Sequence, residues 1–68
     1  MGTIRTYTDA RGRQQRAVDG PNGTYLITRR SDSEPYVVWE SDSLDAAGRF
    51  GDPAAALERA CTLAGIGP

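Results

Sequence analysis

The order of hydrophobic and polar residues along the chain predicts several strands followed by one helix. β-Branched and aromatic side chains alternate with polar ones in four segments, the second of which is the weakest: residues 3–9, 13–18, 24–30 and 36–40. The strongest turn signal, Asp-Gly-Pro-Asn-Gly at 19–23, includes an Asn-Gly step of the kind that hairpin loops favour. We therefore expect an antiparallel sheet of three to four strands.

The pattern changes to a helical period at residue 52. Asp52 suits an N-cap, and Pro53 suits the first helical position, where its missing N–H costs nothing. Gly65 suits the residue after the helix. At 100° per residue the apolar side chains fall in one arc: Ala56, Leu57, Ala60, Cys61, Leu63 and Ala64. The sequence thus predicts a single α+β domain over 1–68, with a C-terminal helix at about 52–64 on one face of the sheet.

The stretch 41–51 has two interpretations. It fits a further short strand around Ala47–Phe50, and it equally fits a single helical turn at Ser43–Ala47. The periodicity is too short to separate them.

Strand alternation sorts the side chains into two sets. Tyr25, Ile27 and Arg29 share one side of their strand. In the next strand, Val37 and Trp39 share one side, and Tyr36, Val38 and Glu40 share the other. An aliphatic-rich set must face the helix, so we expect several of six larger side chains to lie on the open face or its rim: Arg5, Tyr7, Tyr25, Arg29, Tyr36 and Trp39. Whether Trp39 belongs to the core or to an interface stays open.

The composition removes most catalytic chemistries. The 68 residues include one cysteine, Cys61, and no histidine or lysine, so an internal disulfide, a Cys/His metal site and Schiff-base chemistry are excluded. We expect no metal and no cofactor. Cys61 lies in the apolar arc and is expected to be a core thiol. A single free cysteine without an apolar leader favours a reducing, cytoplasmic setting.

Paired carboxylates are the remaining catalytic option. Asp32 and Glu34, and likewise Glu40 and Asp42, stand two residues apart, which on a strand would place each pair on one face. A chain of 68 residues is too short to build a substrate cleft around them, and its glycines form no phosphate-binding loop. We therefore expect no enzyme.

Charge is distributed unevenly along the chain. All eight basic residues are arginines, and the net charge is −1. Residues 1–30 hold six arginines against two aspartates, a net charge of +4, whereas residues 31–68 hold two arginines against seven acids, a net charge of −5. Arginine makes forked contacts to carboxylate and phosphate, which favours a recognition surface. Genomic codon bias explains the arginine excess equally well.

From residue 23 onward the chain resembles the AP2-type and integrase amino-terminal DNA-binding domains. The segments that carry the resemblance are Gly-Thr-Tyr-Leu-Ile-Thr-Arg at 23–29, Pro-Tyr-Val-Val-Trp-Glu at 35–40, and the Gly-x-Phe and alanine-rich helix of 46–60. The resemblance implies a sheet that enters the DNA major groove. Arg29, Trp39 and Arg49 would contact DNA, with Arg5 on the same surface, while Phe50, Ala56 and Ala60 would pack sheet against helix. Several acids near the phosphates would oppose such binding.

The leading expectation is therefore a small non-enzymatic module that binds another protein. Chains of this size and charge are typical of phage and mobile-element accessory proteins, some of which, such as anti-CRISPR proteins, inhibit a basic nucleic-acid-handling partner. The expected partner-binding residues are an acidic patch and two aromatics: Asp32, Glu34, Glu40, Asp42, Asp45, Tyr36 and Trp39. Nucleic acid is the alternative partner, a homodimer stays open, and no membrane contact is expected.

Overall fold

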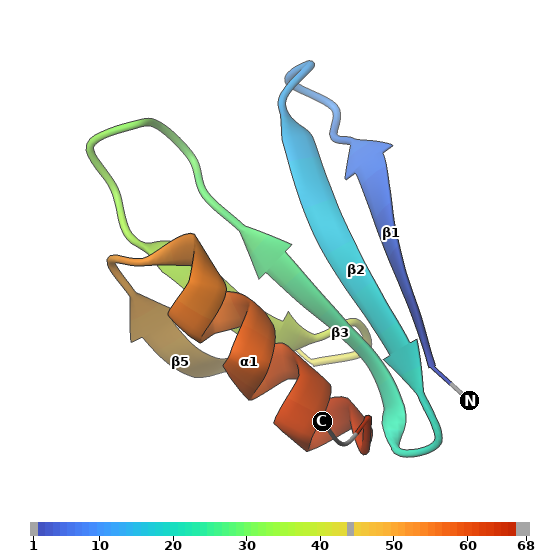
Figure 1. The fold of residues 1–68 in the computed structure, drawn as a ribbon. Coiled ribbons are helices and arrows are strands. Elements are labelled where there is room, and N and C mark those ends of the chain that lie inside the picture. The colour runs from blue at the N-terminus through green and yellow to red at the C-terminus, as the bar shows by residue number, and fades with distance from the viewer. Residues whose placement is uncertain (1, 44, 67–68) are drawn as a thin grey trace.

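The computed structural model describes residues 2–43 and 45–66 and shows one five-stranded antiparallel sheet with a single helix (Figure 1). The strands are β1 (Thr3–Thr8), β2 (Gln14–Gly20), β3 (Gly23–Thr28), β4 (Tyr36–Glu40) and β5 (Ala46–Phe50), and the helix is α1 (Pro53–Ala64). The strands lie in the sheet in sequence order, each antiparallel to the next. The expected α+β class is confirmed, with five strands in place of three to four.

The additional strand is β5, which lies in the stretch 41–51 for which the sequence allowed two interpretations. Residues 46–50 pair with β4 as an edge strand, with Tyr36 opposite Phe50 and Val37 opposite Arg49. A register irregularity between Val38 and Trp39 interrupts the ladder. The alternative helical turn at Ser43–Ala47 is excluded by the strand at Ala46 and Ala47, while Leu44 within it lies outside the described residues.

The helix has the ends that the sequence predicts. The Asp52 carboxylate accepts a hydrogen bond from the Ala54 N–H at 3.3 Å, and Pro53 is the first helical residue. Gly65 adopts a left-handed φ of 85°, and its N–H donates to the Thr62 carbonyl. These contacts satisfy main-chain groups that a helix end leaves without partners.

Small side chains bring the helix close to the sheet. Ala56, Ala60 and Ala64 are fully buried, and they pack on a sheet layer of Val18, Ile27 and Val38. Cys61 is half-buried at the edge of this core, where it packs as an apolar side chain. In so small a domain, close helix–sheet contact excludes water from the little apolar surface available.

The β2–β3 hairpin contacts the end of the helix directly. Its loop is Pro21-Asn22, and the Asn22 N–H donates to the Ala64 carbonyl at 2.9 Å. A Cβ added to Gly20 would lie 2.3 Å from the Ala64 carbonyl oxygen, which is main chain and cannot rotate away. Gly20 therefore sets how closely the helix end approaches the sheet.

Gly20→Ala should destabilise the fold by about 1–3 kcal/mol, because the new methyl group forces the helix end and hairpin apart. Gly51→Ala is the matched control, since nothing lies within 4 Å of a Cβ there and the backbone is not left-handed. Urea denaturation followed by Trp39 fluorescence measures both. Equal unfolding midpoints for the two variants would contradict the close approach.

Strand register assigns each side chain to one face of the sheet. Tyr25 and Tyr36 pack against the core on the helix side, and Glu40 accepts a hydrogen bond there from the Tyr25 hydroxyl. Of the six candidates for the open face, these two tyrosines therefore lie on the helix side. The open face, on the sheet side away from α1, carries Arg5, Tyr7, Leu26, Thr28, Val37, Trp39 and Arg49.

Within the described ranges, no helix has the length and apolar character needed to cross a membrane.

Candidate functional site: a hollow on the open face

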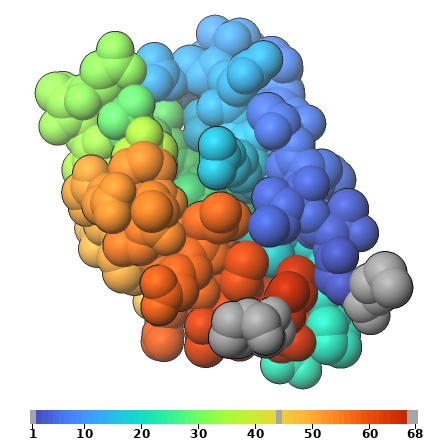
Figure 2. Space-filling view, in the orientation of Figure 1, coloured from blue at the N-terminus to red at the C-terminus, as the bar shows by residue number. Residues whose placement is uncertain are grey.

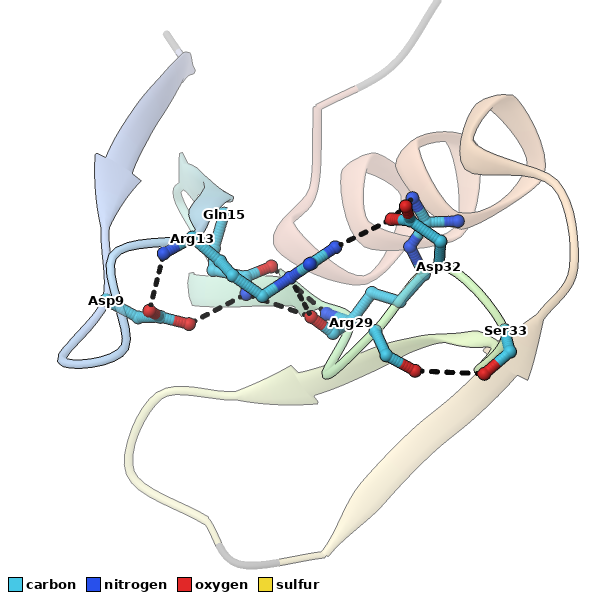
Figure 3. Close-up of polar contacts among 7 residues, drawn as sticks. Asp9, Arg13, Gln15, Arg29, Asp32 and Ser33 are labelled. Carbon is cyan, nitrogen blue, oxygen red and sulfur yellow. Dashed lines mark hydrogen bonds and ion pairs between the residues drawn. The ribbon is translucent and has the colours of Figure 1, made fainter.

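Strands β2 and β3 diverge at one end, and a glutamine side chain joins them there. Their pairing ends at Arg16 opposite Ile27. Beyond that point, Gln15 Nε2 donates to the Arg29 carbonyl at 3.1 Å, and Gln15 Oε1 accepts from the Arg29 N–H at 3.0 Å (Figure 3). The side-chain amide thus replaces both main-chain groups of a neighbouring strand. Gln15 is only 6% exposed, so these bonds are protected from water.

Asp9 fixes the β1–β2 loop to the same glutamine. One of its carboxylate oxygens accepts from the main-chain N–H groups of Arg11 and Arg13 at 2.9 and 3.0 Å, and the other accepts from Gln15 Nε2 at 2.9 Å. The bond from Gln15, followed by those from the main chain, lowers the pKa of Asp9 below its ordinary value. The chain of contacts Asp9–Gln15–Arg29 therefore holds both loops in place.

On the helix side, a second set of contacts joins the same two loops. Arg13 Nε donates to the Arg29 carbonyl at 3.2 Å, and the guanidinium groups of Arg13 and Arg29 both contact Asp32 Oδ1, at 3.1 and 3.4 Å (Figure 3). The Arg29 guanidinium lies 4.3 Å from the Tyr36 ring centroid, within cation–π range. Arg29, another of the six candidates for the open face, therefore directs its guanidinium to the helix side, where the group has a structural role.

A hollow of about 760 Å³ lies on the open face beside this junction. Its floor comes from the sheet and includes Tyr7, Val37 and Trp39, while the β1–β2 and β3–β4 loops form walls. No residue of α1 lines it. The volume lies in the range of sites that hold a small ligand or a few side chains of a partner.

Three arginines from separate parts of the chain surround the hollow. Arg11 comes from the β1–β2 loop, Arg30 from the β3–β4 loop and Arg49 from β5, and all three are exposed. Across residues 2–43 and 45–66, none of them forms an ion pair. Two carboxylates, Asp9 and Glu34, also line the hollow. Because hydrogen bonds already occupy Asp9, free cationic groups outnumber free acids at this site.

Trp39 lies on the floor and is half-buried, which answers the question of core or interface in favour of a surface position. Its indole N–H is buried and has no hydrogen-bond partner among the residues that the structure describes. A buried donor without a partner costs about 1–3 kcal/mol. Trp39 is therefore held by packing and not by a polar contact.

Arg5 and the predicted acids other than Glu34 lie away from the hollow or have other partners. Arg5 is on the open face but pairs with Asp19 at 2.8 Å, and the Thr24 hydroxyl also donates to Asp19. The predicted acids do not form one patch. Asp32 and Glu34 precede β4 and Asp42 and Asp45 follow it, so the strand separates the pairs, and Asp32 is bound by two arginines.

Sequence reasoning missed the residues that organise the site. Gln15 and Asp9 were treated as a polar strand position and a strand end, while Arg11 and Arg30 were not singled out. The sequence offers only a weak signal, a glutamine that shares its side of the strand with Ala17. It does not identify the partner, which lies 14 residues away at Arg29.

Comparisons with protein-family models, with curated proteins and with solved structures found no match to this chain. The resemblance to AP2-type and integrase domains accordingly stays a prediction. In the described part of the chain, no group of three or more His, Cys, Asp or Glu side chains could hold a metal ion.

Gln15→Leu should destabilise the protein by about 2–4 kcal/mol, because it leaves the Arg29 N–H without a partner and removes one donor each from the Arg29 carbonyl and from Asp9. Gln14→Leu is the matched control, since Gln14 is the adjacent residue of the same strand and its side chain is exposed. Chemical denaturation gives the difference in free energy of unfolding. A loss no larger than that of the control would show that the amide does not hold the two strands together.

Stability should fall in acid through Asp9 and Asp19, whose pKa values are both lowered in the folded state by hydrogen bonds, the latter chiefly from Arg5. A lowered pKa contributes stability above the unfolded value of about 3.9 and loses it as pH falls through the folded value. We expect the urea midpoint to drop below about pH 4. Asp9→Asn should be less stable at pH 7 but show a smaller drop in acid, and an unchanged drop would contradict the assignment.

Proposed function

We propose that this chain is a small, non-enzymatic protein-binding module and that the open-face hollow is its binding surface. The observation that carries the proposal is the meeting of Trp39 and Tyr7 with three arginines that lack ion-pair partners in the described part of the chain. Trp, Tyr and Arg are the residue types that most often dominate binding energy at protein interfaces. The cavity gives a partner side chain a place to be desolvated.

Rigid support of the site favours recognition over a merely solvated surface. Both loops that form its walls are tied to each other through Gln15 and through the Arg13–Asp32 pair. A site with its walls fixed before binding loses less conformational entropy when the partner arrives. This arrangement supports tighter binding than the same side chains on free loops would give.

Charge indicates the chemistry of the partner. The unpaired arginines favour carboxylates, which they can bind through two parallel hydrogen bonds, and the apolar floor favours an aromatic or aliphatic side chain. The partner is therefore expected to present an acidic segment with an apolar anchor. The acids expected to attract a basic partner lie at opposite ends of β4, so a nucleic-acid-mimicking inhibitor surface has less geometric support.

Peptides selected from a displayed random library should be rich in Asp or Glu with one large apolar residue. Arg30→Glu and Arg49→Glu should each weaken binding of a selected peptide about tenfold, since each removes one charged contact and adds a repulsive one. Arg59→Glu, on the exposed side of α1, is the matched control. An NMR titration would report binding through the single Trp39 indole signal. Peptides that bind all variants equally would contradict the proposal.

Nucleic acid is a second candidate partner, because the same three arginines and two aromatic rings suit phosphates and bases. The net charge of −1 opposes it. We expect no saturable binding of a labelled random DNA duplex or single strand at 0.15 M salt, taken as about physiological ionic strength. Fluorescence anisotropy measures it. Saturable binding with a log–log salt slope of about −2 to −3, removed by substituting the three arginines, would put nucleic acid first.

A further inference from the structure

Strand β1 is an edge of the sheet that lacks the usual features that prevent pairing with another chain. It is six residues long and pairs with β2 without any irregularity. It contains no proline, lysine or bulge, which natural edge strands often use to block further pairing, and its one charged side chain, Arg5, is paired with Asp19 of β2. At the opposite edge, by contrast, β5 is shorter and its ladder is interrupted between Val38 and Trp39.

The helix leaves β1 uncovered. α1 contacts each of β2, β3, β4 and β5, but among the described elements β1 contacts only β2. Figure 2 shows β1 in blue along one margin of the molecule, with the orange and red helix covering the region beside it. Ile4, on the helix side of β1, is 50% exposed, the large apolar side chain that the structure leaves most open.

The hydrogen-bond pattern shows which main-chain groups of β1 face outward. The Asp9 N–H donates to the Arg13 carbonyl across the hairpin. Since the direction alternates along an antiparallel strand, the N–H groups of Thr3, Arg5 and Tyr7 point to β2. Those of Ile4, Thr6 and Thr8 therefore point away from the sheet and are available to another strand.

We propose that β1 pairs antiparallel with β1 of a second copy of this chain, about a two-fold axis at Thr6. In this register Thr6 lies opposite Thr6, Ile4 opposite Thr8, and Arg5 opposite Tyr7 of the second copy. Five of the six residues of the strand, Ile4 to Thr8, are then paired with strand residues of the second copy, and Thr3 lies opposite Asp9. A register centred on Arg5 would place like charges opposite each other, which is unfavourable. A register centred on Tyr7 would place Ile4 opposite a loop.

The symmetry has a consequence for the binding surface. An axis through two paired edge strands runs perpendicular to the sheet, so both open faces point in the same direction. Tyr7 lies on β1 and lines the hollow, so the two hollows lie on either side of the new seam. A partner with two acidic segments would then bind both copies at once and gain affinity through effective concentration. The pairing itself does not rest on the proposed function.

Single cysteines test the register in a Cys61→Ser background. Thr6→Cys should form an intermolecular disulfide with oxidised glutathione, because directly opposed hydrogen-bonded residues have Cα atoms about 5.5 Å apart. Thr8→Cys is the matched control, exposed on the same side of the same strand. Its two copies would be about 14 Å apart, too far for a disulfide. Equal cross-linking of both variants, or none of Thr6→Cys, would overturn the proposal.

A second measurement uses the unmodified chain. Amide exchange at Ile4, Thr6 and Thr8 should slow at least tenfold between low-micromolar and near-millimolar protein, while sedimentation shows a shift from monomer to dimer. Thr6→Pro removes an outward N–H without removing a bond to β2, so it should stay monomeric while its circular dichroism matches the parent. A monomer at all concentrations, or a dimer that Thr6→Pro leaves intact, would overturn the proposal.

Discussion

The structure of the site depends on the Gln15 side-chain amide. It forms with the Arg29 main chain the two hydrogen bonds that a paired neighbouring strand would otherwise form. A sheet can diverge only where the freed main-chain groups find other partners, since a buried group without one costs about as much as a lost hydrogen bond. Gln15 supplies a donor and an acceptor at the correct spacing, at 3.1 and 3.0 Å. The separation of β2 from β3 is thereby made stable, and the hollow lies beside it.

Six of the eight arginines fall into two groups according to their partners and positions. Arg5, Arg13 and Arg29 pair with aspartates and connect strands or loops. Arg11, Arg30 and Arg49 surround the hollow and pair with no acid in the described ranges. The first group uses the several N–H donors of arginine for structural contacts. The second group leaves cationic side chains around the hollow, although the net charge of the protein is negative.

Much of the fold follows from local rules, whereas the site does not. The ends of α1 were predicted from Asp52, Pro53 and Gly65, because caps act within a few residues. Alternation correctly grouped Tyr25, Ile27 and Arg29 on one side. It left open that Arg29 lies on the helix side, where stacking on Tyr36 allows a charged group to sit beside the core. The acids were grouped as one patch because they are close in sequence, although the predicted strand 36–40 separates Asp32 and Glu34 from Asp42 and Asp45. Gln15 could not be recognised, since its partner is distant in the chain.

The arrangement of contacts implies that ligand binding and stability are coupled at this end of the sheet. The two loops are joined through side chains and not through a continuous ladder, so this region should open before the helix-covered core does. A ligand that contacts Arg11 on one wall and Arg30 on the other would add a bond across the opening. Anything that binds only the closed arrangement stabilises it by mass action. If the hollow binds a partner as proposed, the strength of the Gln15 link would set how much of the binding free energy goes into ordering the walls and how much appears as affinity.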